Sequence, residues 1–288
     1  MAKKKQKRQG GVKIPSTIIK IGKILQAISP TLTTKYVRYL FQKPMNHKPR
    51  RDELPLLEKA QIDYLAVPEI RKKIAVYHWG DGNKKALVVH GWSSRPTQLY
   101  KFIQGLLDKG YTVYSFDGPA HGKSSGNKTM MPEYIKTIEK ITEIFGPFEI
   151  AIGHSMGGIS LLNVQSNHHF FNKIAVIGTP DSIRNIFNNF IKLLELKPII
   201  AEKLIKVFEK ITGKKIEEFH GSNLAKNIKK PVLIVHDEND AEVPIEYAEN
   251  NYHHLQNGKL LRTKALGHNR ILKDDKVVRS VIDFLMKE

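Results

Sequence analysis

The sequence of 288 residues contains no cysteine. This absence excludes disulfide bonds, thiolate metal sites and a cysteine nucleophile together, so any covalent catalysis has to come from Ser, Thr, Asp, Lys or His. The chain also lacks an uninterrupted run of eighteen apolar residues, which argues against a transmembrane helix. A cleaved signal peptide is not expected either, because Lys20 and Lys23 interrupt the apolar stretch from Ile14 to Ile28. These absences fit a reducing, cytoplasmic location.

Acidic residues are scarce near the start of the chain. Residues 1–60 hold fifteen Lys and Arg against three acids, which accounts for +12 of the formal net charge of +19. A basic arm of this kind can contact anionic lipid or nucleic acid, or can serve only as a solvated tail. We expect weak contact with an anionic membrane surface at the inner face of the membrane, and do not expect nucleic acid as a partner. Residues 1–13 are low in complexity and are predicted to be disordered.

Two amphipathic helices are predicted to follow the basic arm. In residues 16–29 the apolar side chains recur at three- and four-residue steps, at Ile18, Ile21, Leu25 and Ile28. Pro30 is expected to end this helix and Thr31 to cap the next. The apolar stripe of the second helix consists of Leu32, Tyr36, Val37, Leu40 and Phe41. We assign residues 1–58 to this basic, helical extension, whose stripes either pack on the main domain or touch a membrane.

From Gln61 onward, short β-rich runs alternate with helical stretches, and residues 59–288 are assigned to one domain. The predicted strands are Ile74–Trp79, Ala86–His90, Thr112–Phe116, Glu149–Gly153, Ile174–Ile177, Val232–His236 and Lys259–Thr263. Alternation favours a mostly parallel sheet with helices on both faces and an active site beyond the carboxyl ends of the strands. The interval 181–230 lacks a strand, so we expect a small helical cap at about residues 181–228.

Residues 153–157 read Gly-His-Ser-Met-Gly and match the G-x-S-x-G nucleophile elbow. The motif follows a predicted strand and precedes a helix predicted to begin near Gly157, which is where an elbow has to lie. The turn forces the serine into a strained conformation that is tolerable only when the flanking residues lack bulk, which explains the glycines at 153, 157 and 158. Ser155 is therefore the candidate nucleophile.

The candidate oxyanion donors are two backbone N–H groups. His90, Gly91 and Trp92 follow an apolar strand, and Gly91 lets the backbone turn sharply. The N–H of Trp92 can then point, together with the N–H of Met156, at a developing oxyanion. The alternative is that His90 and Gly91 form only an ordinary connection from a strand to a loop.

Four acids follow the predicted strand Val232–His236, and one of them is expected to orient the catalytic base. Asp237, Glu238, Asp240 and Glu242 are the candidates, and the spacing ahead of Val243 and Pro244 favours Asp240. The other three are expected to be solvated loop charges.

His268 lies after the last predicted strand and before the last helix, and is the candidate base. The order Ser155, Asp240, His268 differs from the trypsin-like and subtilisin-like orders. The pairs at residues 168–169 and 253–254 are expected to be surface histidines, because neighbouring side chains point in different directions. No metal site is predicted.

With these segments in order, the chain from about Ile74 to its end resembles the α/β-hydrolase superfamily. Residues 116–124, Phe-Asp-Gly-Pro-Ala-His-Gly-Lys-Ser, are similar to the D-x-P-G-H-G-x-S loop of that family, with Ala120 in place of the usual glycine. The departure is expected to be harmless for catalysis. The resemblance implies an eight-stranded sheet, a helical cap after the sixth strand and a triad of Ser155, Asp240 and His268. It is greatest to small bacterial hydrolases with a basic helical extension.

The expected activity is carboxylesterase-like hydrolysis of a small, apolar acyl ester through an acyl-enzyme, without metal or organic cofactor. Thioester hydrolysis or acyl transfer would use the same residues and stays an alternative. A non-catalytic basic binding module on the same fold is the alternative from another class. The apolar side chains expected to line the cap pocket are Phe187, Phe190, Leu193 and Leu194.

Overall fold

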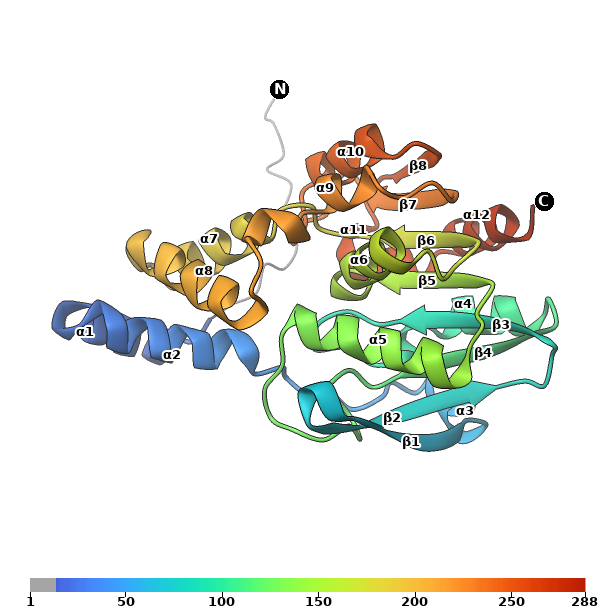
Figure 1. The fold of residues 1–288 in the computed structure, drawn as a ribbon, viewed down its shortest axis with the longest axis horizontal. Helices are drawn as coiled ribbons and strands as arrows, with labels where there is room; N and C mark the ends of the chain where they lie inside the picture. Colours follow the sequence, from blue (N-terminus) through green and yellow to red (C-terminus); the bar gives the residue numbers. More distant parts are fainter. Residues whose placement is uncertain (1–13, 288) are drawn as a thin grey trace, which may run out of the picture.

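The computed structural model describes residues 14–287, so the predicted disorder of residues 1–13 lies outside the described part of the chain. Its centre is an eight-stranded sheet with the order β1-β2-β4-β3-β5-β6-β7-β8 (Figure 1). The strands are β1 (Gln61–Val67), β2 (Lys72–Trp79), β3 (Lys84–Val89), β4 (Tyr111–Phe116), β5 (Ile150–His154), β6 (Lys173–Ile177), β7 (Val232–Asp237) and β8 (Gly258–Thr263). Strand β2 pairs antiparallel with β1 and β4, and the other pairs are parallel. The predicted α/β class with a mostly parallel sheet is confirmed.

Helices cover both faces of the sheet because side chains along each buried strand alternate between them. In β3, Leu87 and Val89 belong to the apolar core under α5 (Met131–Phe145) and α6 (Met156–His168). Ala86 and Val88 belong to the opposite core. That core lies under α4 (Tyr100–Leu107) and α12 (Asp275–Met286), which lie behind the sheet in Figure 1. The shorter helices are α3 (Leu54–Glu58), α10 (Ile245–His254) and α11 (Gly267–Arg270).

The interval between β6 and β7 contains α7 (Ile183–Leu193), α8 (Ile199–Thr212) and α9 (Gly221–Ala225), and no strand among its described residues. Two further helices come from the other end of the described chain: α2 (Pro30–Gln42) lies against α8, and α1 (Ser16–Ile28) packs on α2. Together α1, α2, α7 and α8 form a lobe that projects from the edge of the sheet to which the parallel strands run (Figure 1). We call this assembly the helical lobe.

The junction between α1 and α2 corrects the prediction that Thr31 caps the second helix. Helix α2 begins at Pro30, and the Ser29 hydroxyl accepts a hydrogen bond from the backbone N–H of Leu32 at 3.4 Å. Proline suits the first helical position because its fixed φ is already helical and no backbone donor is needed there. Ser29 is therefore the N-cap, and Pro30 opens α2 while ending α1.

Several contacts join α1 to the loop between α7 and α8. Lys23 forms an ion pair with Glu195, and the Gln26 side-chain oxygen accepts a hydrogen bond from the backbone N–H of Lys197 at 2.6 Å. Gly22 is buried, and a methyl group placed on it would lie in van der Waals contact with Leu196. One side of α1 is thus packed on the helical lobe. Within residues 14–287, no helix combines the length and the apolar content needed to cross a bilayer.

Candidate active site

Ser155 occupies a strained turn between β5 and α6. Its backbone angles are φ 51° and ψ −117°, a region that residues with a side chain rarely adopt and that costs about 1–3 kcal/mol. The backbone N–H of Ser155 donates to the Ile177 carbonyl at 2.9 Å, which ties the turn to the end of β6. The serine therefore lies at the carboxyl ends of the parallel strands and at the start of a helix, as the elbow motif predicts.

The glycines beside Ser155 are required because backbone atoms fill the space around them. A Cβ at Gly157 would lie 2.4 Å from the carbonyl oxygen of Val89, and one at Gly153 would lie 2.8 Å from the Gly158 Cα. Backbone cannot yield to such an overlap as the end of a flexible side chain can. The first turn of α6 therefore packs directly on β3, as the glycine pattern of the sequence indicates.

Asp240 and His268 meet through a buried hydrogen bond. The Nδ1 of His268 lies 2.7 Å from Oδ2 of Asp240, and both side chains are at least nine-tenths buried. The other carboxylate oxygen accepts hydrogen bonds from the backbone N–H groups of Glu242 at 2.8 Å and Val243 at 2.9 Å. Because a carboxylate can only accept, Nδ1 of His268 carries the proton and Nε2 is left with a free lone pair. This is the tautomer that a general base requires.

In this pair, attraction between the charges and hydrogen bonding outweigh the effect of burial on both pKa values. Burial disfavours the imidazolium of His268, but the hydrogen bond and the charge of Asp240 outweigh it and raise the pKa above the ordinary 6.5. Burial also opposes the charge of Asp240, yet its pKa is lowered because His268 and two backbone N–H groups stabilise the carboxylate. Asp240 is consequently ionised at neutral pH and is able to stabilise a protonated His268.

The loop that carries His268 is fixed against the residue that precedes Ser155. The side chain of His154 donates from Nε2 to the backbone carbonyl of His268 at 3.1 Å, and the centroids of the two rings are 4.7 Å apart. Burial, followed by the charge of His268, lowers the pKa of His154 to about 3, so this side chain is neutral. His154 therefore holds the backbone of His268 beside the turn of Ser155.

The turn that contains Trp92, one of the two expected oxyanion donors, lies next to Ser155. A Cβ on Gly91 would be 3.0 Å from the Cβ of Ser155, so only a glycine allows this approach. Met156 is the first residue of α6, where a backbone N–H has no acceptor within the helix. Within residues 14–287, the N–H groups of Trp92 and Met156 donate to no other group. Both are available to a ligand at this position.

His121 supports the same turn, although no role was predicted for it from the sequence. Its Nε2 accepts a hydrogen bond from the backbone N–H of Ser93 at 3.0 Å, Nδ1 donates to the Pro119 carbonyl at 3.0 Å, and the ring packs edge-on against Trp92 at 5.6 Å. Burial, with the neighbouring His90, lowers the pKa of His121 to about 3. The signal was present in the Gly-Pro-Ala-His-Gly loop, whose histidine was given no role because that loop supplies no triad member.

Asp237 is not the solvated loop charge that we expected from the sequence. The side chain is buried and accepts hydrogen bonds from the Thr263 hydroxyl at 2.7 Å, the Leu266 N–H at 2.9 Å and the Asn239 N–H at 2.9 Å. It thereby joins the loop with Asp240 to the loop with His268. The reason lies in the fold, because β7 and β8 are neighbours and end side by side. Glu238 and Glu242 are exposed, as expected.

An aromatic cluster from α2 and α7 adjoins Trp92. The ring of Phe41 lies 6.4 Å from Trp92, 4.8 Å from Phe187 and 5.3 Å from Phe190. Phe187 is buried and Phe190 half-buried, whereas Leu193 is 48% exposed and so does not join the cluster. Of the residues predicted to line a cap pocket, Phe187 and Phe190 belong to this cluster and Leu194 is buried. Phe41 is a member of the cluster that was not named from the sequence.

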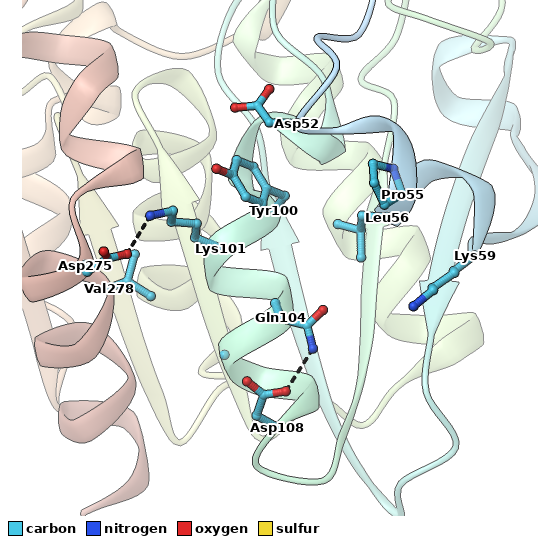
Figure 2. A pocket seen from close by; sticks show the side chains of 11 residues that line it. Asp52, Pro55, Leu56, Lys59, Tyr100, Lys101, Gln104, Asp108, Asp275 and Val278 are labelled. Carbon is cyan, nitrogen blue, oxygen red and sulfur yellow. Dashed lines mark hydrogen bonds and ion pairs between the residues drawn. The ribbon is translucent and has the colours of Figure 1, made fainter.

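Within the described residues, no group of three or more His, Asp or Glu side chains is placed to hold a metal ion. A pocket of about 470 Å³ lies between α3, α4 and α12 (Figure 2). Its polar groups pair with each other, Lys101 with Asp275 and Gln104 with Asp108. Four of its polar side chains are therefore engaged with one another, and Ser155, Asp240 and His268 are not among its lining residues.

Comparisons with known proteins agree with this geometry. A family model described as "Alpha/beta hydrolase family" matches residues 86–204, and one described as "TAP-like protein" matches residues 209–288. The "Uncharacterized hydrolase YugF" of Bacillus subtilis (strain 168) is 23% identical over 236 residues, which are 66% of this chain and 86% of that protein.

Solved structures show the same fold. Esterase Pf2001 of Pyrococcus furiosus has 21% identity and a TM-score of 0.65, covering 84% of this chain and 98% of its own. Est1E of Butyrivibrio proteoclasticus, with ferulic acid bound, has 17% identity and a TM-score of 0.63, covering 78% and 98%. The chain belongs to the α/β-hydrolase superfamily. Its family and relatives support a hydrolase.

Proposed function

We propose that the chain is a serine hydrolase that cleaves a carboxylic ester of an apolar acyl group. The observation that carries the proposal is the buried 2.7 Å hydrogen bond between Asp240 and His268, fixed beside the strained turn of Ser155. A carboxylate, an imidazole with a free Nε2 and a serine hydroxyl at a strained turn are the parts that acyl transfer by a serine nucleophile requires.

In this mechanism Ser155 Oγ attacks the ester carbonyl while Nε2 of His268 takes the hydroxyl proton. The oxyanion accepts hydrogen bonds from the N–H groups of Trp92 and Met156. When the tetrahedral intermediate collapses, His268 returns the proton to the departing alcohol. Water then attacks the acyl-enzyme with His268 again as base, and the carboxylic acid leaves as Ser155 recovers its proton.

The aromatic cluster supports an apolar acyl group. Phe41, Phe187 and Phe190 gather beside Trp92, next to the proposed oxyanion donors, and present rings rather than charges. In an apolar pocket, binding of an acyl chain becomes more favourable with each methylene group that is removed from water. We therefore propose acyl chains of medium length as substrates in preference to acetate.

Labelling with a fluorophosphonate tests the proposal, because the reagent reacts only with an activated serine. The wild-type protein should be labelled and should hydrolyse p-nitrophenyl esters. Ser155→Ala should remove the label and reduce kcat by about 10⁴ or more, since removal of a triad member leaves only binding and oxyanion stabilisation. Ser160→Ala, in the same helix, is the matched control. Labelling of the Ser155→Ala protein, or retention of a tenth of its activity, would contradict the proposal.

A further inference from the structure

Helix α1 presents a row of apolar side chains to solvent. Ile21, Ile24 and Ile28 are 47%, 61% and 68% exposed, and their spacing of three and four residues places them on one face of the helix. Leu32, four residues further on at the start of α2, is 45% exposed. We call these four residues the apolar stripe. Single exposed apolar residues are common, but a contiguous row of them marks an interaction surface.

The stripe is not a face that the fold left half-packed. The other side of α1 already holds the helix on the helical lobe, through Gly22 against Leu196 and through the ion pair of Lys23 with Glu195. The backbone carbonyl of Ile18 also accepts a hydrogen bond from the Tyr36 hydroxyl at 3.3 Å. Packing therefore accounts for one side of α1, and the stripe on the remaining side has no structural partner within residues 14–287.

The charge around the stripe selects its partner. Residues 1–51 contain fourteen Lys and Arg and no acid at all. In the described helices, Lys20 on α1 and Lys35 on α2 are exposed. Basic side chains beside a row of large apolar ones suit the boundary between anionic head groups and acyl chains. A nucleic acid would use the lysines but would leave the isoleucines in water, and a second copy of the chain would bring like charges together.

We propose that α1 and the start of α2 dock the protein on an anionic membrane surface, with the apolar stripe inserted at the head-group boundary. Helix α2 leads from this surface to the proposed active site, since Leu32 lies at its start and Phe41, beside Trp92, near its end. Thirteen helical residues span roughly 20 Å, which is the distance along α2 between its two ends. The docking itself does not depend on the proposed ester hydrolysis.

Sedimentation of the full-length protein with vesicles tests the inference. The protein should pellet with vesicles made of equal amounts of phosphatidylcholine and phosphatidylglycerol at low salt, should be released at high salt, and should ignore phosphatidylcholine alone. The variant Ile24→Gln/Ile28→Gln should bind at least about tenfold more weakly, because it removes most of the apolar insertion. Thermal melting and hydrolysis of a water-soluble ester should be unchanged, which separates this result from any failure of the catalytic proposal.

The matched control is Ile144→Gln/Ile211→Gln, which replaces isoleucines that are 51% and 57% exposed on α5 and at the end of α8. It should bind vesicles as the wild type does. Lys20→Gln/Lys35→Gln should weaken binding and flatten its dependence on salt. Equal binding by the stripe variant and the wild type would overturn the inference. So would binding to an RNA oligonucleotide without binding to vesicles, or a dimer in sedimentation equilibrium that the stripe variant dissolves.

Discussion

Four buried histidines around the site hold backbone groups in place instead of carrying charge. His90 donates to the Gly91 carbonyl at 2.7 Å, and His236 donates to the Val243 carbonyl at 2.8 Å beside the loop of Asp240. His121 and His154 act in the same way on the neighbouring loops. Burial lowers the pKa of all four. His268 differs because the charge of Asp240 reverses the effect of burial.

Asp240→Asn should reduce kcat by about 10⁴, since the amide NH₂ would face the Nδ1–H of His268 and favour the wrong tautomer. Glu242→Gln is the control, because Glu242 is exposed and reaches only Asn269. Its activity should stay within about threefold of wild type. An equal loss from both substitutions would show that the loop, and not this hydrogen bond, matters.

The pH dependence follows from the same pair. The base has to be neutral, and its pKa is raised above 6.5, so kcat/KM should rise with pH through an apparent pKa above that value. In Asp240→Asn the stabilising carboxylate is gone while burial remains, so the acidic limb of the residual activity should move to lower pH. A limb at the same pH in both proteins would assign it to another group.

Ala120 occupies the position where the family loop usually has glycine, and its backbone φ is 63°. A side chain in this left-handed region costs about 1 kcal/mol relative to glycine. Ala120→Gly should therefore raise the free energy of unfolding by up to about 1 kcal/mol, partly offset by the greater freedom of the unfolded chain. Urea unfolding measures it, and a clear loss of stability would show that the methyl group packs well enough to outweigh the strain.

At the scale of elements, the strands with continuous apolar runs could be predicted to within two residues, because burial on both faces leaves a clear pattern. Strand β1 was not among the strands predicted from the sequence. In Gln61–Val67 the alternation of apolar and polar side chains is weak, and only Val67 is fully buried. This strand lies at the edge of the sheet, where one antiparallel partner is enough to hold it. The packing of α1 on residues 195–197 could not be predicted from the sequence either, because it joins segments that are distant in sequence.

The proposed site could likewise be predicted from the sequence only in part. Ser155, Asp240 and His268 could be named from the sequence because each follows a strand in a recognisable order. The burial of Asp237 could not, since two of its three donors, Thr263 and Leu266, are brought near only by the pairing of β7 with β8. Local pattern reveals the chemistry, whereas the hydrogen bonds that position it depend on contacts between distant segments.

Helix α2 should influence substrate choice through Phe41. Phe41→Ala would remove the ring that contacts Trp92, Phe187 and Phe190, and would enlarge the space beside the proposed oxyanion donors. We expect the preference for medium over short acyl chains, measured as a ratio of kcat/KM, to fall by about 10-fold. Tyr39→Ala on the same helix is the control, since Tyr39 is 42% exposed. An unchanged ratio would remove α2 from the acyl pocket.

For the whole molecule, the buried histidines predict sensitivity to acid. The folded pKa values of His121 and His154 are about 3 and that of His90 about 4, all below the ordinary 6.5. Below pH 6.5 the unfolded chain therefore binds protons that the folded protein does not, so stability falls as the pH falls. The slope should be about 1.4 kcal/mol per pH unit for each histidine.

Urea unfolding at pH 7, 6 and 5 measures this slope. His121→Asn should lower it by the contribution of one proton, and His253→Asn should not, because His253 is exposed. The raised pKa of His268 acts in the opposite sense and above pH 6.5, where its contribution to stability is lost as the pH rises. A stability that is flat from pH 7 to 5 would mean that these histidines are solvated.

Helix α1 packs on residues that lie much later in the sequence, so its contacts can form only after those residues have been synthesised. Lys23 is separated from its partner Glu195 by 172 residues. At the usual pace of translation the ribosome needs roughly ten to thirty seconds to cover that distance. Throughout this interval α1 and α2 have emerged without the surface on which they dock, and both of their apolar sides face water. The two helices made first among the described elements are thus completed late, and a chaperone or a membrane has its earliest opportunity to meet the nascent chain there.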